Sequence, residues 1–530
     1  MFFIMPVFLK NILYTASLLV TELASCQRSI NPIKPANLKN SQSYYLDVSG
    51  NDANNGGKTR PWKTITKLNS IQLNPGDTVY FAGGQTFAGS ILLDANDSGL
   101  KEKPVTLTST GNANAIIDAG GATALTVYQT SYINILNLHF TGSGRKTGNT
   151  KDGVIINSSK HIFIDSLSIN GFQKSGLLIF SSSDADINRV HAYNNGFAGI
   201  LVNGLADKND CRNISIRYCF AENNPGDPTN FTNHSGNGIL VGMCRNVTIE
   251  YCSATNNGWD MPRTGNGPVG IWAYEADSVL IQNCISYRNK TSPGANDGGG
   301  FDLDGGVTNS TIQYCFSYEN QGSGYGIFQY SGAGNWFNNT IRFNISENDG
   351  AVTANCAGIL IWNSSRDTAQ FKNCAVYNNT IYNSKAPAIA YASESENTGF
   401  RFCNNIFVGN DSIVIGKETN SSYFGNDWYS LKSGFNIGGI TNFQTWINTK
   451  NKEKLNGAIA GFNIHPSFLH AGHSIITDPS EMSTFKNYQL PAGSVLRNNG
   501  LDLQTRLLIN NGGKTFNGGA ASSKLIGATD

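Results

Sequence analysis

The 530-residue sequence predicts an all-β fold in which short strands stack as the coils of a parallel solenoid. Three observations lead to this prediction: a segment that recurs at nearly regular intervals, columns of like side chains within it, and a composition suited to tight turns. Glycine accounts for 58 residues and proline for only 15, while 14% of the residues are charged. This mixture suits short strands joined by turns rather than long solvated helices.

The recurring segment carries an isoleucine at the same place in each copy. These isoleucines are Ile164, Ile187, Ile216, Ile249, Ile281, Ile312 and Ile341, separated by 23, 29, 33, 32, 31 and 29 residues. Three residues further on lies a second column, formed by Leu167, Val190, Cys219, Cys252, Cys284, Cys315 and Asn344. The steps are too short for a βαβ unit with a helix in every turn, so each step predicts one coil.

A second strand follows a turn rich in Gly and Asn in each coil, as in "GILVG" at 238, "GIWAY" at 270, "GFDLD" at 300, "GIFQY" at 326 and "GILIW" at 358. Because side chains alternate across a strand, the first and third residues after the glycine are expected inside and the second and fourth outside. Aligning the glycines predicts aromatic neighbours for both aspartates of "GFDLD": Trp272 and Phe328 beside Asp302, and Tyr274 and Tyr330 beside Asp304.

From about Tyr44 to the C-terminus these repeats resemble the right-handed parallel β-helix superfamily, the pectin-lyase-like fold shared by many polysaccharide lyases and some glycoside hydrolases. "YYLDVSGNDANNGGKTRPWKTI" followed by "LNPGDTVYFAGG" is similar to the first segment of secreted members, and "LIGATD" is similar to their usual ending. The resemblance implies a right-handed parallel β-helix with N- and C-terminal caps. It transfers no catalytic residue, because members place different catalysts on the same coils.

The stretch "NDGGGFDLDGG" from 296 to 306 holds the candidate catalytic residues Asp297, Asp302 and Asp304. Asp302 and Asp304 take the two outward positions of one strand, about 6.5 to 7 Å apart by the strand rise. The candidate substrate-binding residues are the aromatics Trp272, Tyr274, Phe328, Tyr330 and Trp362, together with His234 and Arg263 from long loops before the strands. Carboxylates between flat apolar rings are typical of a sugar-binding groove.

Three functions remain open for this site. A glycoside hydrolase, slightly preferred, would use Asp302 and Asp304, with Asp297 or Glu275, as acid and base and would need no cofactor. A polysaccharide lyase acting on a uronic-acid polymer would need a cation from the turns, supplied by Arg263, Arg288 or Lys290, and the three aspartates would then hold Ca²⁺. The third is a non-catalytic glycan-binding solenoid, and a purely structural "DLD" covered by loops is also open.

The N-terminus indicates export. An apolar stretch from Ile12 to Val20 precedes "LASC", which resembles a bacterial lipobox with Cys26 as the acylated residue. We therefore expect a monomeric lipoprotein at the outer membrane or cell surface, in the periplasm or outside the cell, with a polysaccharide and the membrane as partners. The 38 basic and 37 acidic side chains give a net charge of +1, which speaks against nucleic acid.

The sequence divides into a lipoprotein signal peptide (1–25), a linker (26–43), an N-terminal cap with the first coils (44–125), the repeats with the active-site face (126–410), and C-terminal coils with a cap (411–530). "WINTKNKEKLNGAIAG" is expected to be a short helix or irregular cap. Most of the ten cysteines are interpreted as small buried hydrophobes, with a Cys211–Cys244 pairing left open. Asn344, Asn379 and Asn405 predict a ladder of side-chain amides.

Replacement of Cys26 tests the lipoprotein interpretation. Cys26→Ala should abolish acylation and release a soluble protein, because Cys26 is the only anchor that the sequence offers. Metabolic labelling with a fatty acid, followed by fractionation, measures both effects. A wild-type chain that incorporates no label would contradict the prediction.

Overall fold

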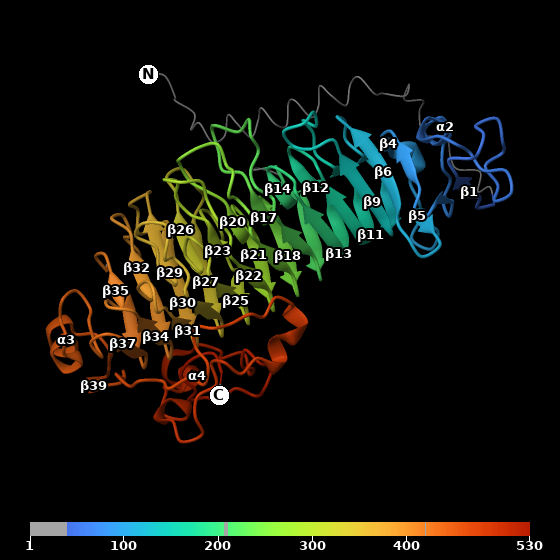
Figure 1. Ribbon diagram of the computed structural model, residues 1–530. Helices are drawn as coiled ribbons and strands as arrows, with labels where there is room; N and C mark the ends of the chain where they lie inside the picture. The colour runs from blue at the N-terminus through green and yellow to red at the C-terminus, as the bar shows by residue number, and fades with distance from the viewer. Residues whose placement is uncertain (1–39, 206–209, 419, 530) are drawn as a thin grey trace. The chain divides into compact units, whose positions relative to one another are not determined.

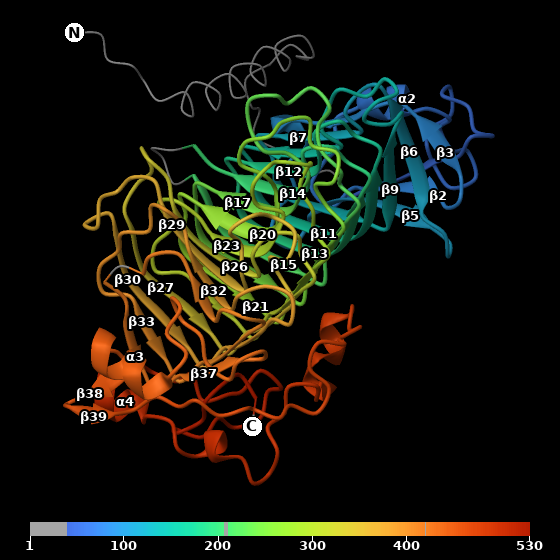
Figure 2. The same ribbon diagram turned by 60° about the vertical axis from the view of Figure 1, so that its left-hand side comes forward.

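The computed structural model describes residues 40–205, 210–418 and 420–529, and the chain from Ser41 onward forms one compact unit. The proposed signal peptide and Cys26 lie outside the described residues. Parallel strands stack coil upon coil, which the continuous colour order of Figures 1 and 2 makes visible. The predicted all-β parallel solenoid is confirmed. Among the described residues, no helix has the length and apolar character needed to cross a membrane.

One face of the described coils is a parallel sheet of 12 strands. Its strands are β4 (Ile91–Leu93), β7 (Leu125–Tyr128), β10 (Val154–Asn157), β12 (Ser175–Phe180), β14 (Ala198–Asn203), β17 (Asn237–Gly242), β20 (Val269–Tyr274), β23 (Gly299–Leu303), β26 (Tyr325–Gln329), β29 (Ile359–Asn363), β32 (Ile389–Tyr391) and β35 (Val414–Ile415). This sheet carries the "GFDLD" segment, and we call it the β23 sheet.

The remaining coil strands form two parallel rows that are joined into a sheet of 25 strands within the described part of the chain. The first row contains β1 (Ser43–Leu46), β2 (Thr78–Ala82), β5 (Val105–Thr110), β8 (Ser131–Leu136), β15 (Cys211–Arg217), β18 (Cys244–Glu250), β21 (Asp277–Gln282), β24 (Thr311–Gln313), β27 (Trp336–Arg342), β30 (Phe371–Tyr377), β33 (Arg401–Cys403) and β36 (Ser422–Phe424). The second row contains β3 (Thr86–Ala88), β6 (Ala115–Gly120), β9 (Leu138–Gly142), β16 (Phe220–Glu222), β19 (Ser253–Thr255), β22 (Ile285–Tyr287), β25 (Phe316–Tyr318), β28 (Ile345–Glu347), β31 (Thr380–Tyr382), β34 (Ile406–Gly409) and β37 (Asp427–Ser430). The long strands β11 (Lys160–Asn170) and β13 (Ser183–Tyr193) belong to both rows.

The isoleucine column predicted from the sequence forms the interior of the first row. Each isoleucine is the register partner of the next, from Ile164 and Ile187 to Ile312 and Ile341. All of them are buried, and each buried side chain of this size contributes about 1.5 to 3 kcal/mol to the free energy of unfolding. The in-register repetition therefore builds one continuous core along the coils.

Side-chain amides stack in two ladders, of which the sequence analysis found one. In the predicted ladder, the Asn379 amide nitrogen donates to Asn405 Oδ1 at 2.9 Å, and Asn379 Oδ1 accepts from the backbone and side chain of Asn344 at 3.0 Å. The second ladder consists of Asn195, Asn224, Asn257, Asn289, Asn320 and Asp349. Both ladders bond buried backbone groups at the turns, where an unpaired group would be costly.

The cysteine column continues the first ladder toward the N-terminus. Cys284 accepts the backbone N–H of Cys252 at 3.4 Å and lies 3.2 Å from the Gln282 carbonyl oxygen to which its thiol donates. The nine cysteines among the described residues are buried and free, including the register partners Cys211 and Cys244. The structure contains no disulfide between these two.

Short helices close both ends of the coil stack. Near the N-terminal end, α2 (Ile65–Asn69) buries Ile65 and Leu68 in the same core as Trp62. At the other end, α3 (Phe443–Lys450) begins at the cap residue Asn442 and buries Trp446 against Trp428, with ring centroids 5.4 Å apart. The segment expected to be a short helix or irregular cap thus begins inside a short helix, which ends at Lys450. Coil strands continue to Ser430, although the sequence period fades near Asp411.

Beyond the hairpin of β38 (Lys454–Leu455) and β39 (Ala458–Ile459), the chain turns back along the second row of strands, as Figure 1 shows below β25 and β31. This C-terminal segment contains α4 (Leu503–Leu507) and the 3₁₀ turns Pro479–Thr484 and Val495–Arg497, whereas a further 3₁₀ turn, Ala95–Asp97, lies between β4 and β5. The C-terminal segment packs on the second row. It buries Ile285, Phe316 and Ile345 beneath Phe485 and Phe516. Glu347 fixes it by accepting hydrogen bonds from Ser474 and Tyr488.

The asparagine ladder gives a prediction about stability. Asn379→Ala should lower the free energy of unfolding by about 3 kcal/mol, because it leaves several buried backbone groups without partners. Cys284→Ala removes a weaker acceptor from the same column and should cost about 1 kcal/mol. Urea denaturation followed by circular dichroism measures both values. Equal losses in the free energy of unfolding of the two variants would show that the hydrogen bonds of the ladder contribute no stability beyond side-chain packing.

Candidate functional site

The aspartates of "GFDLD" lie on the outer face of the β23 sheet, as predicted. Asp302 points away from the core, while its neighbours Phe301 and Leu303 are buried within it. Along the stack, its row reads Leu178, Leu201, Leu240, Trp272, Asp302, Gly326 and Leu360. Asp302 is thus the one acid in a row of aliphatic and aromatic residues.

The predicted neighbours on the C-terminal side are wrong by two residues. Asp302 pairs with Gly326, not with Phe328, and Phe301 pairs with Tyr325. The segment "GYGIF" contains two glycines, and Gly324 rather than Gly326 takes the repeat position, since Tyr325 and Ile359 are register partners. A shift of two residues keeps inward and outward positions unchanged, which is why the alternation alone could not reveal it.

The glycine opposite Asp302 makes space for its carboxyl group. A Cβ atom at Gly326 would lie only 2.8 Å from Asp302 Oδ1. The loops before the strands close over this space, so Asp302 is only 2% exposed and Oδ1 has no hydrogen-bond partner. The cavity beside it, which Asp297, Ser323 and Cys356 help to line, measures about 10 Å³, roughly the space of one water molecule. Asp302 therefore points away from the coil core but lies under the loops, which is the alternative that the sequence left open.

Three other carboxyl groups lie close enough to Asp302 or to Asp304 for their charges to interact, and they are less deeply buried than Asp302. Asp304 follows the strand and accepts the Gly305 N–H at 2.7 Å. Asp297 precedes the strand and accepts the Gly267 N–H at 2.7 Å. Glu275, from the preceding coil, accepts the Gly334 N–H at 3.0 Å and the Tyr330 hydroxyl at 3.2 Å. We call Glu275, Asp297, Asp302 and Asp304 the acid group.

Burial raises the pKa of every member of the acid group. The pKa of Asp297 rises to about 6 and that of Asp304 to about 7, and the charges of Asp297 and Glu275 add to the second shift. Desolvation followed by the charges of Asp304 and Asp297 holds the pKa of Asp302 well above its usual range. Burial raises the pKa of Glu275 as well, against hydrogen bonds from Gly334 and Tyr330 that favour its ionised form. The four carboxyls consequently differ in their tendency to hold a proton near neutral pH.

The predicted aromatic residues divide into a buried and a partly exposed set. Trp272 is 4% exposed and its indole N–H donates to Asn237 Oδ1 at 3.1 Å. Tyr274 and Phe328 are also buried, and the Tyr274 hydroxyl reaches back to Asn203 Oδ1 at 2.7 Å. These three rings fill the space under the loops and offer no open stacking surface. Tyr330 and Trp362 are partly exposed at the edge of the acid group.

The loop residues predicted at the site lie beside the acid group. His234 is buried edge-on against Trp272, with ring centroids 4.9 Å apart, and its Nδ1 accepts a hydrogen bond from the Asn237 amide nitrogen at 3.1 Å. Burial, followed by the nearby charge of Arg263, lowers the pKa of His234 to about 4, so the ring is neutral at pH 7. Arg263 donates to the Thr232 carbonyl oxygen, and its charge opposes the burial that raises the pKa of Asp297. Arg288 pairs with Glu319 instead.

The donors for a cation do not converge. No three His, Cys, Asp or Glu side chains in the described part of the chain are grouped as a metal ion would require. Asp297 and Asp304 each direct an oxygen at a backbone N–H, and the space beside Asp302 would not hold a hydrated Ca²⁺. The residues as placed do not fit the predicted calcium site.

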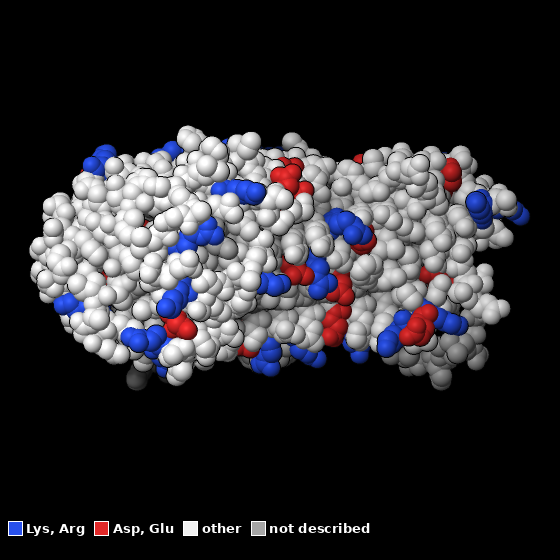
Figure 3. All heavy atoms as spheres, turned by 90° about the horizontal axis from the view of Figure 1, so that it is seen from below, with Lys and Arg blue, Asp and Glu red and all other residues white. Residues whose placement is uncertain are grey.

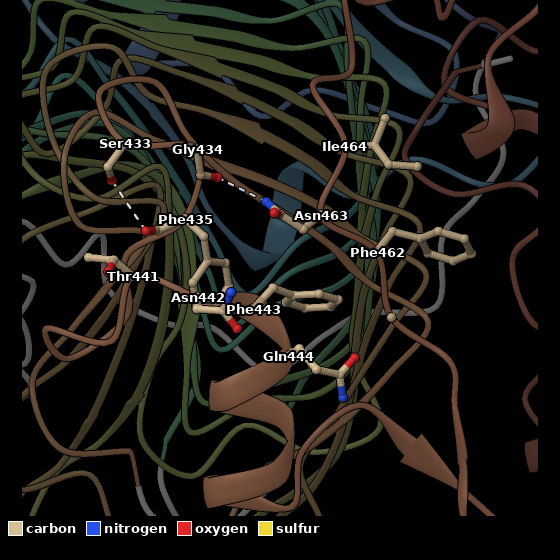
Figure 4. A pocket seen from close by; sticks show the side chains of 11 residues that line it. Ser433, Gly434, Phe435, Thr441, Asn442, Phe443, Gln444, Phe462, Asn463 and Ile464 are labelled. Atoms are coloured by element: carbon tan, nitrogen blue, oxygen red, sulfur yellow. Dashed lines mark hydrogen bonds between the residues drawn. The ribbon is translucent and has the colours of Figure 1, made fainter.

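Other features of the surface carry no comparable chemistry. Figure 4 shows a pocket of about 500 Å³ near α3, lined by Phe435, Phe443, Phe462 and the amides of Asn442, Gln444 and Asn463. It contains no ionisable side chain. On the face in Figure 3, acidic and basic side chains are interspersed. Neither region rivals the acid group as a catalytic centre.

Comparisons with known protein families agree with this architecture. Residues 44–271 match the family model described as "Pel9A-like, right handed beta helix region", and residues 223–376 match "Right handed beta helix region". Together the two matches identify residues 44–376 as right-handed β-helix regions. The Pel9A-like match ends at residue 271. All four residues of the acid group therefore lie outside it and within the second match, "Right handed beta helix region".

Solved structures similar to this β-helix chain include enzymes that act on carbohydrates. The lacto-N-biosidase of family GH136 from Eubacterium ramulus is 16% identical, with 72% of this chain and 68% of the other covered and a TM-score of 0.46. Pectate lyase Pel9A is 15% identical, with 93% and 97% covered and a TM-score of 0.42. A mannuronic acid specific family 6 lyase from human gut microbiota is 15% identical, with 73% and 81% covered and a TM-score of 0.43. No curated protein matches the chain.

The acid group predicts how stability depends on pH. Asp302 keeps a proton in the folded chain that the unfolded chain releases near pH 4, so its contribution to stability falls as the pH rises. Asp302→Asn should therefore gain stability relative to wild type between pH 4 and pH 8, by on the order of 1 to 3 kcal/mol. Thermal unfolding at both pH values measures the difference.

Asp277→Asn is the matched control, with the opposite sign. Hydrogen bonds from Asn309, Thr308 and Ser278 lower the pKa of Asp277, so its contribution is present at pH 8 and is lost in acid. This variant should be less stable than wild type at pH 8. A loss of stability at pH 8 in Asp302→Asn would mean that Asp302 is an ionised, stabilised group.

Proposed function

We propose that the chain is an exported carbohydrate-active enzyme that cleaves a polysaccharide at the acid group, by glycoside hydrolysis with carboxyl groups as acid and base. The observation that carries the proposal is the cluster of four carboxyl groups at and beside the end of β23, where burial raises the pKa of each to a different extent. Carboxyl groups whose environments separate their pKa values are suited to opposite roles in proton transfer.

The partly exposed members are the best candidates for direct action on a glycosidic bond. Asp304, with a pKa of about 7, keeps its proton in a large fraction of molecules at neutral pH and can protonate the leaving oxygen. Glu275 accepts hydrogen bonds from Gly334 and Tyr330 that favour its carboxylate, so it can activate water or attack carbon. Asp302 is too deeply buried to touch the substrate and is assigned to hold a proton.

Substrate would reach the acid group along the edge left by the covering loops. Tyr330 and Trp362 are partly exposed there and offer ring faces to pyranose C–H groups. Trp272 and Phe328 support the site from below instead of stacking on the sugar. We also propose that export through the N-terminal segment and acylation at Cys26 bring the enzyme to its substrate.

A polysaccharide lyase is the second candidate. The Pel9A-like family match favours it, since the solved Pel9A is described as a pectate lyase. Arg263 beside Asp297 also provides the positive charge that a uronate carboxylate needs. The lyase with Ca²⁺ would require loop rearrangement to bring Asp297, Asp302 and Asp304 together, because they do not converge in this structure.

One assay separates the candidates. The mature protein is incubated with a panel of neutral and uronic-acid polysaccharides, with and without a chelator, while reducing ends and ultraviolet absorbance of unsaturated ends are followed together. Reducing ends alone, unaffected by chelator, are expected for the hydrolase. Unsaturated ends that need added Ca²⁺ would establish the lyase, and the absence of both products would leave a glycan-binding protein.

Variants of the acid group test the assignment of roles. Asp304→Asn and Glu275→Gln should fold normally and lower kcat by a factor on the order of 10² or more, as expected on removal of an acid or base. Trp362→Ala should mainly raise KM, because it removes a stacking surface. Asp427→Asn is the control, since Asp427 is a buried carboxyl of raised pKa on β37 and lies outside the acid group. Full activity of Asp304→Asn with Glu275→Gln would exclude these residues as catalysts.

A further inference from the structure

A second pocket lies at the turns that follow the second row of strands, several coils toward the N-terminus from the acid group. It has a volume of about 470 Å³ and is lined by Gly142, Ser143, Arg145, Asn170, Asn194 and Trp259, among others. Volumes of this size are common for sites that bind small molecules. Trp259 comes from the long loop before β20, whereas the other five residues belong to earlier coils.

We propose that this pocket is a remote subsite that binds one pyranose residue of the polysaccharide, with Trp259 as its stacking surface. The proposal rests on the proposed function only in that both sites would hold the same polymer. Binding at this pocket requires no catalysis, so the two can be tested separately.

The tryptophan is both accessible and held in place. Trp259 is 46% exposed, in contrast to the buried Trp272. The Arg145 guanidinium lies 5.9 Å from the centre of its ring, within the range of a cation–π contact. Arg145 is itself fixed, because it donates to the Gly226 carbonyl oxygen at 2.9 Å and forms an ion pair with Asp260. A ring positioned in this way loses little freedom when a sugar stacks on it.

The rest of the lining provides backbone and amide groups without bulky side chains. A Cβ atom at Gly142 would lie 2.6 Å from the Gly171 carbonyl oxygen, so these two turns approach as closely as glycine allows. Asn170 and Asn194 present side-chain amides, and Asn170 Oδ1 is already oriented by a contact to His139 Nε2 at 2.8 Å. Amide groups beside an aromatic ring match the hydroxyls and C–H faces of a pyranose.

The charge near the pocket tolerates acidic sugars. Asp260 pairs with both Arg145 and Lys146, so two cations face one carboxylate. These ion pairs lower the pKa of Asp260 despite its partial burial, which keeps it ionised at neutral pH. One positive charge is left in excess, and a uronate residue would meet no repulsion here.

The distance between the two sites suits a polymer. From β12 to β23 the register passes through β14, β17 and β20, which is four coil steps of about 4.8 Å, or about 19 Å along the stack. The loop that carries Trp259 also carries Arg263, whose charge acts on Asp297 of the acid group. A disaccharide at the acid group cannot reach Trp259, whereas a longer chain can occupy both sites.

Affinity electrophoresis of the full mature chain tests binding directly. Gels contain polygalacturonate, alginate, xylan or galactomannan, and Asp304→Asn serves as the background so that turnover does not remove the polysaccharide. Trp259→Ala in this background should weaken retardation by at least one of the four polymers about five- to tenfold. Tyr218→Ala is the matched control, since Tyr218 is 53% exposed at the turn between β15 and β16 and does not line the pocket.

Kinetics on substrates of different length provide the second readout. With active enzyme, Trp259→Ala should raise KM for the polymer severalfold and leave KM for a trisaccharide of the same sugar unchanged. No retardation of the Asp304→Asn background in any gel, or equal retardation of Trp259→Ala and Tyr218→Ala, would overturn the subsite. Loss of retardation in Trp259→Ala without any turnover in the wild type would support the subsite while contradicting the proposed function.

Discussion

The register between successive coils is the constraint on which the rest of the structure depends. Each strand pairs in parallel with its equivalent one coil away, so every side chain meets its counterpart at the spacing of a sheet. Apolar side chains then form a continuous core, while asparagines that would be isolated and costly inside another fold satisfy one another along two ladders. The same rule makes any departure from the pattern conspicuous, because a single residue interrupts a row of otherwise similar neighbours.

The acid group is such a departure, and the local register explains how it is accommodated. Asp302 stands in a row of leucines and would meet an unfavourable neighbour on the next coil if Phe328 were its partner. Gly326 takes that place instead and leaves room for the carboxyl group. Desolvation under the loops then separates the pKa values of the four acids. Packing, and not a network of ion pairs, therefore sets the proton affinities at this site.

The fold was predictable from the sequence because the same type of side chain recurs at the equivalent position of each coil. The column from Ile164 to Ile341 fixed the coils, and the alternation after the repeated glycine fixed which residues face the core. The two-residue error at "GYGIF" arose because two glycines compete for one repeat position, and only the pairing of Tyr325 with Ile359 resolves them.

Asp297, Asp302 and Asp304 were found as a group because they break a pattern. The role of Glu275 in the acid group could not be predicted from the sequence, because it depends on hydrogen bonds from Tyr330 and Gly334 two coils away. The burial of Trp272 under the loops could not be predicted either, because the loops do not follow the repeat of the coils.

The C-terminal segment has a consequence for the order in which the molecule matures. Coils near the N-terminus can stack as soon as they emerge, because each needs only its neighbours. Ile285, Phe316 and Ile345 behave differently, since their cover is supplied by residues near 476 to 528. Until the last part of the chain has been delivered, a strip of apolar side chains on the second row stays open to solvent. A chain truncated before this segment would therefore expose an apolar strip that favours proteolysis and aggregation with other truncated copies. In the folded chain the C-terminal segment covers that strip.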